Sequence, residues 1–353
     1  MSYQEKLKAL KVVELAQVLA GPAVGMFFAE LGSEVVKVEN KLTNGDLTRQ
    51  WKVSGEEASS SVSAYYHTVN WHKKVLMMDL SDKIDQSALH NLLEDADILL
   101  VNFKSGDAEK FGLESSVLRN RYPRLIIGEI VGYVDSDKVA YDAVLQAESG
   151  FMYMNGQPGD PPLKMPVALI DLLAAHQLKE ALLLALLKRE WEGTGSVVSV
   201  ALYNAAVASL ANQASTYLNT GIIPTRQGSL HPGIAPYGEV FTAADEVDVL
   251  LAVGTDEQFR RLLNVLQLED LLSDTRFNTN RARVVHRQEL DGHLSAAVRG
   301  ISSADLLKQL SDNKVPAAAI KNMAEVFREP IAAEMVLTQL EENGKYSKRV
   351  STV

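Results

Sequence analysis

The chain has 353 residues, of which 46% are hydrophobic and 23% charged, and its formal net charge is −10. This length suits two domains or one large domain with an insertion, and the acidity argues against nucleic acid or an anionic membrane as a partner, since both attract clustered Lys and Arg. The chain has no cysteine, which excludes disulfides, zinc–thiolate sites and a thiol nucleophile and favours a cytoplasmic location.

Apolar strand patterns alternate with helical patterns through roughly the first 200 residues. Such alternation, with nearly continuous hydrophobic strands, is typical of a parallel sheet covered by helices on both faces, so we expect an α/β fold. The predicted strands are Lys11–Leu15, Glu34–Glu39 and residues 74–80, 97–103, 125–133 and 196–202, and helices are expected over Ile84–Glu94 and after Leu169.

The crossover between the first two strands reads as the opening of a dinucleotide-binding βαβ unit, but its glycines do not fit. Gly21 and Gly25 are four residues apart, and Pro22 follows the first of them. Binding of a pyrophosphate at this turn requires the pattern G-x-G-x-x-G, so that the backbone can approach the phosphates. The glycines therefore do not predict a dinucleotide site.

A long apolar stretch at residues 165–191 contains Asp171, His176, Lys179 and Glu180. Because a membrane-spanning helix tolerates few such groups, we expect a buried core helix and no membrane partner. Asp171 lies near the helix start, where acids commonly cap helices. The free N–H groups there would also keep its carboxylate ionised in an apolar site, and such a carboxylate can attack an activated acyl group. Spacing leaves both interpretations open.

Residues 101–113 follow a predicted buried strand, and parallel sheets bind ligands at the carboxyl ends of their strands. Phe103 could stack on a base while Lys104 and Lys110 meet phosphates, or the segment is an ordinary strand-to-helix loop. Residues 77–82 end another strand and have the same alternatives. The seven histidines are scattered without H-x-x-x-H spacing, so no metal site is expected.

The character of the sequence changes near residue 220. Residues 219–241 are rich in Gly, Pro and Thr and have no hydrophobic periodicity, which indicates a linker into a second domain. Beyond it, a strand at 246–254 and amphipathic helices at 256–267 and 287–300 indicate a smaller α+β domain.

Motifs along most of the chain together resemble one family, the class III coenzyme A transferases, which share a fold with α-methylacyl-CoA racemase. The family's opening A-G-P, its L-G-x-E-V-x-K-V-E strand and its G-D-x-x-R appear between residues 20 and 49. Ser105 stands where the family's N-F-x-P-G loop has proline. The remaining matches are NWHKKVLMMDL, ADILLVNFKSG, AYDAVLQAESG and RQGSLHPGIAPYGEVF.

The resemblance implies a Rossmann-like parallel-sheet large domain with a smaller α+β domain, assembled as an interlocked ring homodimer. Coenzyme A, as acyl-CoA, would be a substrate and not a permanently bound cofactor, and a small carboxylic acid would be the second substrate. The implied domains are a large CoA-binding domain at 1–200, a linker at 201–225, a small domain at 226–310 and a returning C-terminal segment at 311–353.

The resemblance also implies the site residues. Asp171 falls at the position of the family's catalytic aspartate. The crossover after the first strand and three later segments would border CoA. The implied CoA-binding residues are Val18, Leu19, Met78, Asp79, Leu80, Asn102, Phe103, Lys104, Lys110, Lys138, Val139, Ala140, Tyr141 and Asp142.

The implied reaction is CoA transfer through an aspartyl anhydride and an aspartyl-CoA thioester, both formed on Asp171. The racemase branch is an alternative, but it uses His–Asp where this chain has Tyr141–Asp142. A tyrosine, with a pKa near 10, is a poor base at neutral pH, which favours transfer. A catalytically silent CoA-binding protein is the other alternative, because no glycine-rich loop that could cover the site is visible after residue 220.

Overall fold

A computed structural model describes residues 2–341 and 344–353 of the chain. The chain divides into two compact units: the first comprises residues 1–152, 164–223 and 334–353, and the second comprises residues 153–163 and 224–333. Within the described residues, no helix is both long enough and apolar enough to cross a membrane.

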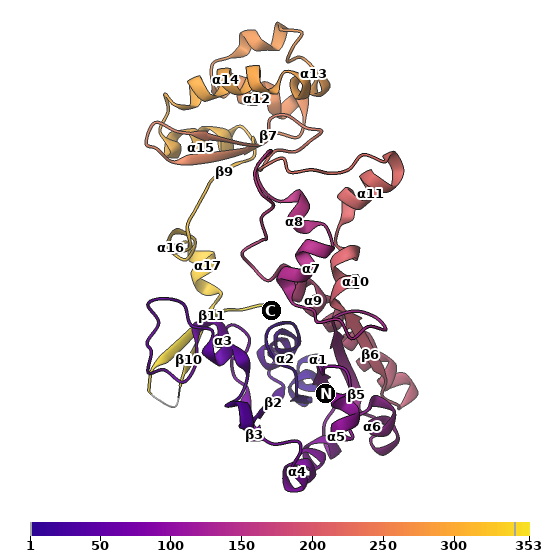
Figure 1. The fold of residues 1–353 in the computed structure, drawn as a ribbon. Helices are drawn as coiled ribbons and strands as arrows, with labels where there is room; N and C mark the ends of the chain where they lie inside the picture. Colours follow the sequence, from indigo (N-terminus) through magenta and orange to yellow (C-terminus); the bar gives the residue numbers. More distant parts are fainter. Residues whose placement is uncertain (1, 342–343) are drawn as a thin grey trace. The chain divides into compact units, whose positions relative to one another are not determined.

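The first unit is built on a six-stranded sheet in the order β3-β2-β1-β4-β5-β6, with every neighbouring pair parallel (Figure 1). This order reverses direction between β1 and β4, which is the switch point of a Rossmann-type sheet. The prediction of a parallel sheet is therefore confirmed. The strands are β1 (Lys11–Glu14), β2 (Glu34–Asn40), β3 (Lys74–Met78), β4 (Ile98–Val101), β5 (Ile126–Val131) and β6 (Val197–Ala201).

Helices cover both faces of this sheet, as the continuous apolar strands predict. In β4, Ile98 and Leu100 join a core cluster with helices α2 and α9, whereas Leu99 and Val101 join a second cluster with α4 and α6. Alternate residues of a strand point to opposite faces, so both faces of β4 must be apolar. The helices up to residue 121 are α1 (Tyr3–Lys8), α2 (Ala20–Glu30), α3 (Ala64–His67), α4 (Lys83–Glu94), α5 (Asp107–Phe111) and α6 (Ser115–Arg121), with 3-10 turns at Lys41–Thr43 and Leu47–Gln50.

The apolar stretch at 165–191 forms a core helix, as expected. This helix, α9 (Leu169–Glu192), packs against α2 and β5 and ends at Gly193 in the left-handed conformation. The turn at Gly193 then leads into β6, since glycine adopts the left-handed conformation that ends a helix without strain. The other helices of this region are α7 (Asp142–Glu148), α8 (Phe151–Met154), α10 (Leu202–Ala208) and α11 (Ala211–Thr220).

Residues 201–225, expected to be a linker, form two helices instead. They contain α10 and α11, and α10 packs against α9 within the first unit, because its alanines and Leu202 join the core there. The extended segment without helix or strand runs instead from 221 to 236. The chain also rejoins the first unit later than the predicted residue 311, at residue 334. There it forms the antiparallel hairpin of β10 (Val336–Leu340) and β11 (Tyr346–Val350).

The second unit contains both helices and strands, as its sequence predicts. Strands β7, β8 and β9 form an antiparallel sheet, and Phe259, Leu263 and Leu294 belong to its own core cluster. Its elements are β7 (Tyr237–Thr242), β8 (Asp248–Ala252), α12 (Asp256–Val265), a 3-10 turn at Glu269–Ser273, α13 (Asn280–Val285), α14 (Arg287–Val298), α15 (Ser303–Asp312), β9 (Ala317–Ala319) and α16 (Met323–Val326), followed by α17 (Pro330–Glu334).

Candidate functional site

The predicted site residues gather at one edge of the parallel sheet. Val18 follows β1, Met78 ends β3, Asn102 follows β4, and Asp142 follows β5. Because these strands are parallel, their carboxyl ends lie at the same edge. Helix α9 leads into the amino end of β6, so its first turn, with Asp171, starts from this edge as well.

Asp171 lies in the first turn of α9 and is 9% exposed. Within the described residues, its carboxylate accepts no hydrogen bond, and no cation lies within ion-pair distance. Burial, and in second place the charge of Asp142, raise the pKa of Asp171 to about 7. A carboxylate with such a pKa is more basic and more nucleophilic than an ordinary one, and about half of it is ionised at neutral pH.

The expectation that helix N–H groups keep Asp171 ionised is wrong in its detail. The N–H of Ile170, in the first turn of α9, donates to Asp142 Oδ1 at 2.7 Å and not to Asp171. Asp142 thus caps the helix that carries Asp171. Gln146 supports this cap, since its Nε2 donates to Asp142 Oδ2 at 2.6 Å and its Oε1 accepts from Met165 N at 2.8 Å. Desolvation then decides the pKa of Asp171.

Tyr65 is a site residue that the sequence reasoning missed. It lies on α3, packs against the same core cluster as Ile170, and contacts Trp51 edge to face with ring centroids 5.2 Å apart. Burial, followed by the charges of Asp171 and Asp142, raises the pKa of Tyr65 to about 12, so it stays a neutral hydroxyl donor. No spacing in the chain connects Tyr65 with Asp171; only the fold brings them together.

The turn after β1 is tied across the switch point to the end of β4. Gln17 N donates to Asn102 Oδ1 at 3.0 Å, and Asn102 Nδ2 donates back to Gln17 O at 2.8 Å. Asn102, predicted to contact CoA, therefore has its amide engaged with the backbone, and this pair fixes the two neighbouring loops relative to each other. The reciprocal contact could not be read from the chain because the two residues are 85 positions apart.

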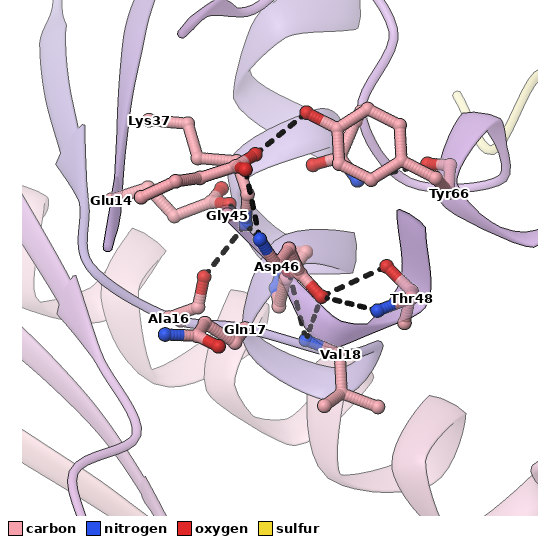
Figure 2. Close-up of polar contacts among 12 residues, drawn as sticks. Glu14, Ala16, Gln17, Val18, Lys37, Gly45, Asp46, Thr48 and Tyr66 are labelled. Atoms are coloured by element: carbon pink, nitrogen blue, oxygen red, sulfur yellow. Dashed lines mark hydrogen bonds and ion pairs between the residues drawn. The ribbon is translucent and has the colours of Figure 1, made fainter. Parts of the chain in front are cut away.

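A buried cluster of charged side chains lies beneath the same turn (Figure 2). Lys37 Nζ is 2.8 Å from Glu14 Oε1 and 3.1 Å from Asp46 Oδ2, and all three side chains are fully buried. Lys73 Nζ contacts Glu14 Oε2 at 2.7 Å, and burial lowers the pKa of Lys73 to about 8. The opposite charges of these buried side chains compensate one another, because an unpaired charge removed from water is strongly unfavourable.

A second ion pair, between buried Glu39 and half-buried Arg49, adjoins this cluster. Arg49 Nε donates to Glu39 Oε2 at 2.6 Å, and the Tyr66 hydroxyl donates to Glu39 Oε1 at 2.7 Å. Glu39 Oε2 also accepts from Asp46 N at 2.8 Å. Gly45, at φ +94, passes so close that an added Cβ would lie 2.2 Å from Glu39 Oε2. The G-D-x-x-R motif thus places a glycine, an acid and an arginine around one buried carboxylate.

The glycines of the crossover serve helix–strand packing. A Cβ on Gly21 would lie 2.4 Å from Ala16 Cβ, and one on Gly25 would lie 1.8 Å from Glu14 Oε2. Four residues apart, the two glycines lie on one face of α2 and let the helix approach β1 closely. Their spacing therefore reflects this close approach.

The other predicted CoA-binding residues lie at or after the carboxyl ends of the strands, and their contact with CoA stays a prediction. Phe103 packs near Phe111, and the Lys110 Nζ lies 5.1 Å from the Phe111 ring centroid. Lys138 pairs with Glu148. Three of the residues pack into or against the cores of the first unit: Leu19, Met78 and Ala140. Two are exposed, Val139 and Tyr141. Asp79 Oδ1 accepts a hydrogen bond from Ser81 N, and Leu80 and Lys104 lie in the loops after β3 and β4.

Comparison with known proteins shows what the chain as a whole is similar to. Residues 7–351 match the sequence profile described as CoA-transferase family III. The chain is 37% identical, over 92% of its length and 82% of the relative's, to a succinate–glutarate CoA-transferase of Agrobacterium fabrum. It is 33% identical, over 96% of its length and 86% of the relative's, to a succinyl-CoA:mesaconate CoA-transferase of Haloarcula hispanica.

A solved structure shows the same fold. The crystal structure of a CaiB/BaiF family protein from Brucella suis superposes with a TM-score of 0.83. The sequence identity is 33%, and the match covers 98% of this chain and 92% of the other. The similarity thus extends over both units of the chain.

Proposed function

Because the chain belongs to CoA-transferase family III, we propose that it transfers coenzyme A from an acyl-CoA thioester to a carboxylic acid with Asp171 as the covalent nucleophile. One observation carries the assignment of Asp171. It is a buried carboxylate without a hydrogen-bond donor within the described residues, at the carboxyl edge of the sheet, with its pKa raised to about 7. Such a group is poised to attack an acyl carbon.

The reaction proceeds in four balanced steps. The Asp171 carboxylate attacks the donor thioester carbonyl and expels CoA thiolate, which leaves a mixed anhydride. The thiolate attacks the aspartyl carbonyl, releases the donor acid and leaves an aspartyl-CoA thioester. The acceptor carboxylate attacks this thioester, expels the thiolate again and forms a second anhydride. The thiolate then takes the acceptor acyl group and frees Asp171.

The environment of Asp171 suits these steps. The anhydrides hydrolyse if water reaches them, and the burial of Asp171 limits that access. Tyr65 stays a neutral phenol, and the charge of Asp171 acts on it, so its hydroxyl is a candidate donor to the reacting group. Asp142, by capping α9 at Ile170, fixes the direction of the helix turn that carries the nucleophile.

Acyl-CoA lies along the loops of the carboxyl edge in this proposal. The segments after β1, β3, β4 and β5 border it, through the residues named above from Val18 to Asp142. The relatives are named for succinate, glutarate and mesaconate, all of which are dicarboxylates. We therefore infer that succinyl-CoA is a donor and that a short dicarboxylate such as glutarate is an acceptor.

The proposal includes an interlocked homodimer. In the first unit, Leu184, Trp191 and Leu218 are 68%, 76% and 78% exposed. Several large apolar side chains exposed on α9 and α11 are typical of a surface that another chain covers. The chain also leaves the first unit after residue 223 and returns to it at residue 334. In the proposed dimer, the second chain passes through the loop that this excursion forms.

Trapping of the acyl-enzyme tests the mechanism. After incubation with succinyl-CoA, hydroxylamine is expected to convert the activated Asp171 to a hydroxamate, which mass spectrometry locates on the peptide that contains it. Asp171→Asn abolishes both the adduct and CoA transfer, because the amide is not a nucleophile. Glu180→Gln, an exposed acid on the same helix, is the matched control and keeps both. An adduct at another residue, or deuterium entry at an α-carbon without CoA exchange, contradicts the proposal.

A further inference from the structure

Val18, in the turn between β1 and α2, has an unusual backbone conformation. Its φ is +73°, in the left-handed region. Among the described residues, it is the only β-branched one at positive φ; the other non-glycine residues there are Asn, His, Asp, Ala, Glu, Gln and Lys. A β-branched residue in this region is strained, and such strain persists only where the surroundings impose it.

The carboxylate of Asp46 binds the backbone of Val18 in this conformation (Figure 2). Val18 N donates to Asp46 Oδ2 at 3.1 Å and, more weakly, to Oδ1 at 3.4 Å. Asp46 Oδ1 also accepts from Thr48 N at 3.0 Å and from Thr48 Oγ1 at 2.8 Å. The Asp46 side chain is fully buried, and Lys37 Nζ lies 3.1 Å from its Oδ2. Its position is therefore fixed from three sides.

Side chains also bind the backbone of the two residues before Val18. Lys37 Nζ donates to Ala16 O at 2.8 Å, and Asn102 exchanges two hydrogen bonds with Gln17. Three consecutive residues after β1 are thus bound by side chains from β2, from the loop after β2 and from the end of β4. A turn held by this many distant groups has one conformation, and Val18 alone requires strain to adopt it.

We propose that Asp46 is a positioning residue for CoA transfer, because its carboxylate holds Val18 in the left-handed conformation that shapes the wall of the site. The inference rests on the proposed function. Val18 packs against the core cluster that contains Ile170, the residue before Asp171. If Val18 relaxes to negative φ, its packing against this cluster changes while Asp171 itself is unaltered.

A double-mutant cycle tests the inference. Asp46→Asn weakens the hold on Val18, and Val18→Gly removes the strain, because glycine adopts positive φ freely. In the Val18 protein, Asp46→Asn is expected to lower kcat for transfer from succinyl-CoA to glutarate at least about tenfold, and in the Val18→Gly protein less than about threefold. This rescue is the readout that a merely structural role does not produce.

Thr48→Val is the matched control, since it removes one hydrogen bond to Asp46 and leaves the bond to Val18 N intact. It is expected to change kcat less than about threefold. An equal loss from Asp46→Asn in both backgrounds overturns the inference. Absence of transfer by the unaltered protein counts against the proposed function, whereas transfer without rescue counts against the positioning role alone.

Amide hydrogen exchange in the unaltered protein tests the hold on Val18 directly. This measurement does not depend on whether any variant folds. We expect the Val18 N–H to be protected as strongly as the amides of β1, because its acceptor is buried. Exchange at the rate of an open turn would show that Asp46 does not hold Val18, whatever the stability of Asp46→Asn.

Discussion

At Asp171, two local effects oppose each other, and burial prevails. A helix N-terminus favours a negative charge by roughly 0.3–1 kcal/mol at exposed sites. Here the accessible N–H of Ile170 donates to Asp142, whose own charge opposes ionisation of Asp171. With burial as the larger cause, the pKa rises to about 7. The site thus obtains a basic carboxylate at neutral pH, which serves a nucleophile better than a fully stabilised anion.

The pH dependence of acylation follows from this pKa. Since the ionised form of Asp171 is the proposed nucleophile, the single-turnover rate with succinyl-CoA is expected to rise through pH 7, level off above it and fall roughly tenfold per unit well below it. In Asp142→Asn, the charge that raises the pKa of Asp171 is gone, so the midpoint moves to lower pH. Stopped-flow kinetics between pH 5.5 and 8.5 measure the shift.

Asp160→Asn provides the comparison for this measurement, because Asp160 is an exposed acid of the second unit. Its midpoint should equal that of the unaltered protein. An unchanged midpoint in Asp142→Asn would mean that the charge of Asp142 does not act on Asp171.

At the scale of elements, the contact between α2 and β1 organises the site. The glycines of α2 permit the approach, and Glu14 of β1 collects Lys37 and Lys73 beneath the turn. A charged strand residue is unusual in the middle of a parallel sheet, because it must be fully paired when buried. Glu14 is paired through both of its oxygens, so the strand remains compatible with the core.

Gly25→Ala is expected to destabilise the protein. In a helix, alanine is normally better than glycine by roughly 0.5–1 kcal/mol. At this position, however, the added Cβ would lie 1.8 Å from Glu14 Oε2, so the buried carboxylate must move. Overpacking of this kind costs about 1–3 kcal/mol, and the steric effect prevails. Urea unfolding measures the loss in the free energy of unfolding.

Gly292→Ala is the matched substitution, because Gly292 lies inside α14 and an added Cβ there meets nothing within 4 Å. It should leave stability unchanged or raise it by roughly 0.5–1 kcal/mol. Equal stabilities of the two variants would mean that α2 and β1 can separate without loss.

At the scale of the whole molecule, the chain closes on itself after a long excursion. Arg349 of the C-terminal hairpin pairs with Glu30 of α2, 319 residues away, and both side chains are 3% exposed. The first unit is therefore completed only when the end of the chain returns to it. Such a discontinuous unit is what an interlocked dimer requires, since each chain must leave and re-enter its own first unit.

The proposed assembly has a direct test. We expect light scattering at low micromolar concentration to give twice the chain mass of 38.6 kDa. The expectation rests on the large apolar side chains exposed on α9 and α11, which are typical of a surface that another chain covers. A single-chain mass at this concentration contradicts the interlocked homodimer and leaves the assignment of Asp171 untouched.

The amino-acid sequence by itself determined the alternation of strands and helices, the family and the candidate nucleophile at the start of α9. These depend on hydrophobic periodicity and on short motifs, which are local properties of a chain. It did not indicate that residues 201–225 contain two helices, of which α10 packs on the core, because the small residues of α10 carry a weak pattern.

Only the tertiary structure decided what surrounds that nucleophile. The raised pKa of Asp171, the neighbouring Tyr65 and the hold of Asp46 on Val18 join segments between 28 and about 106 positions apart. Burial and charge compensation depend on the distances between such segments, and these distances exist only once the sheet has placed the carboxyl ends of its strands side by side.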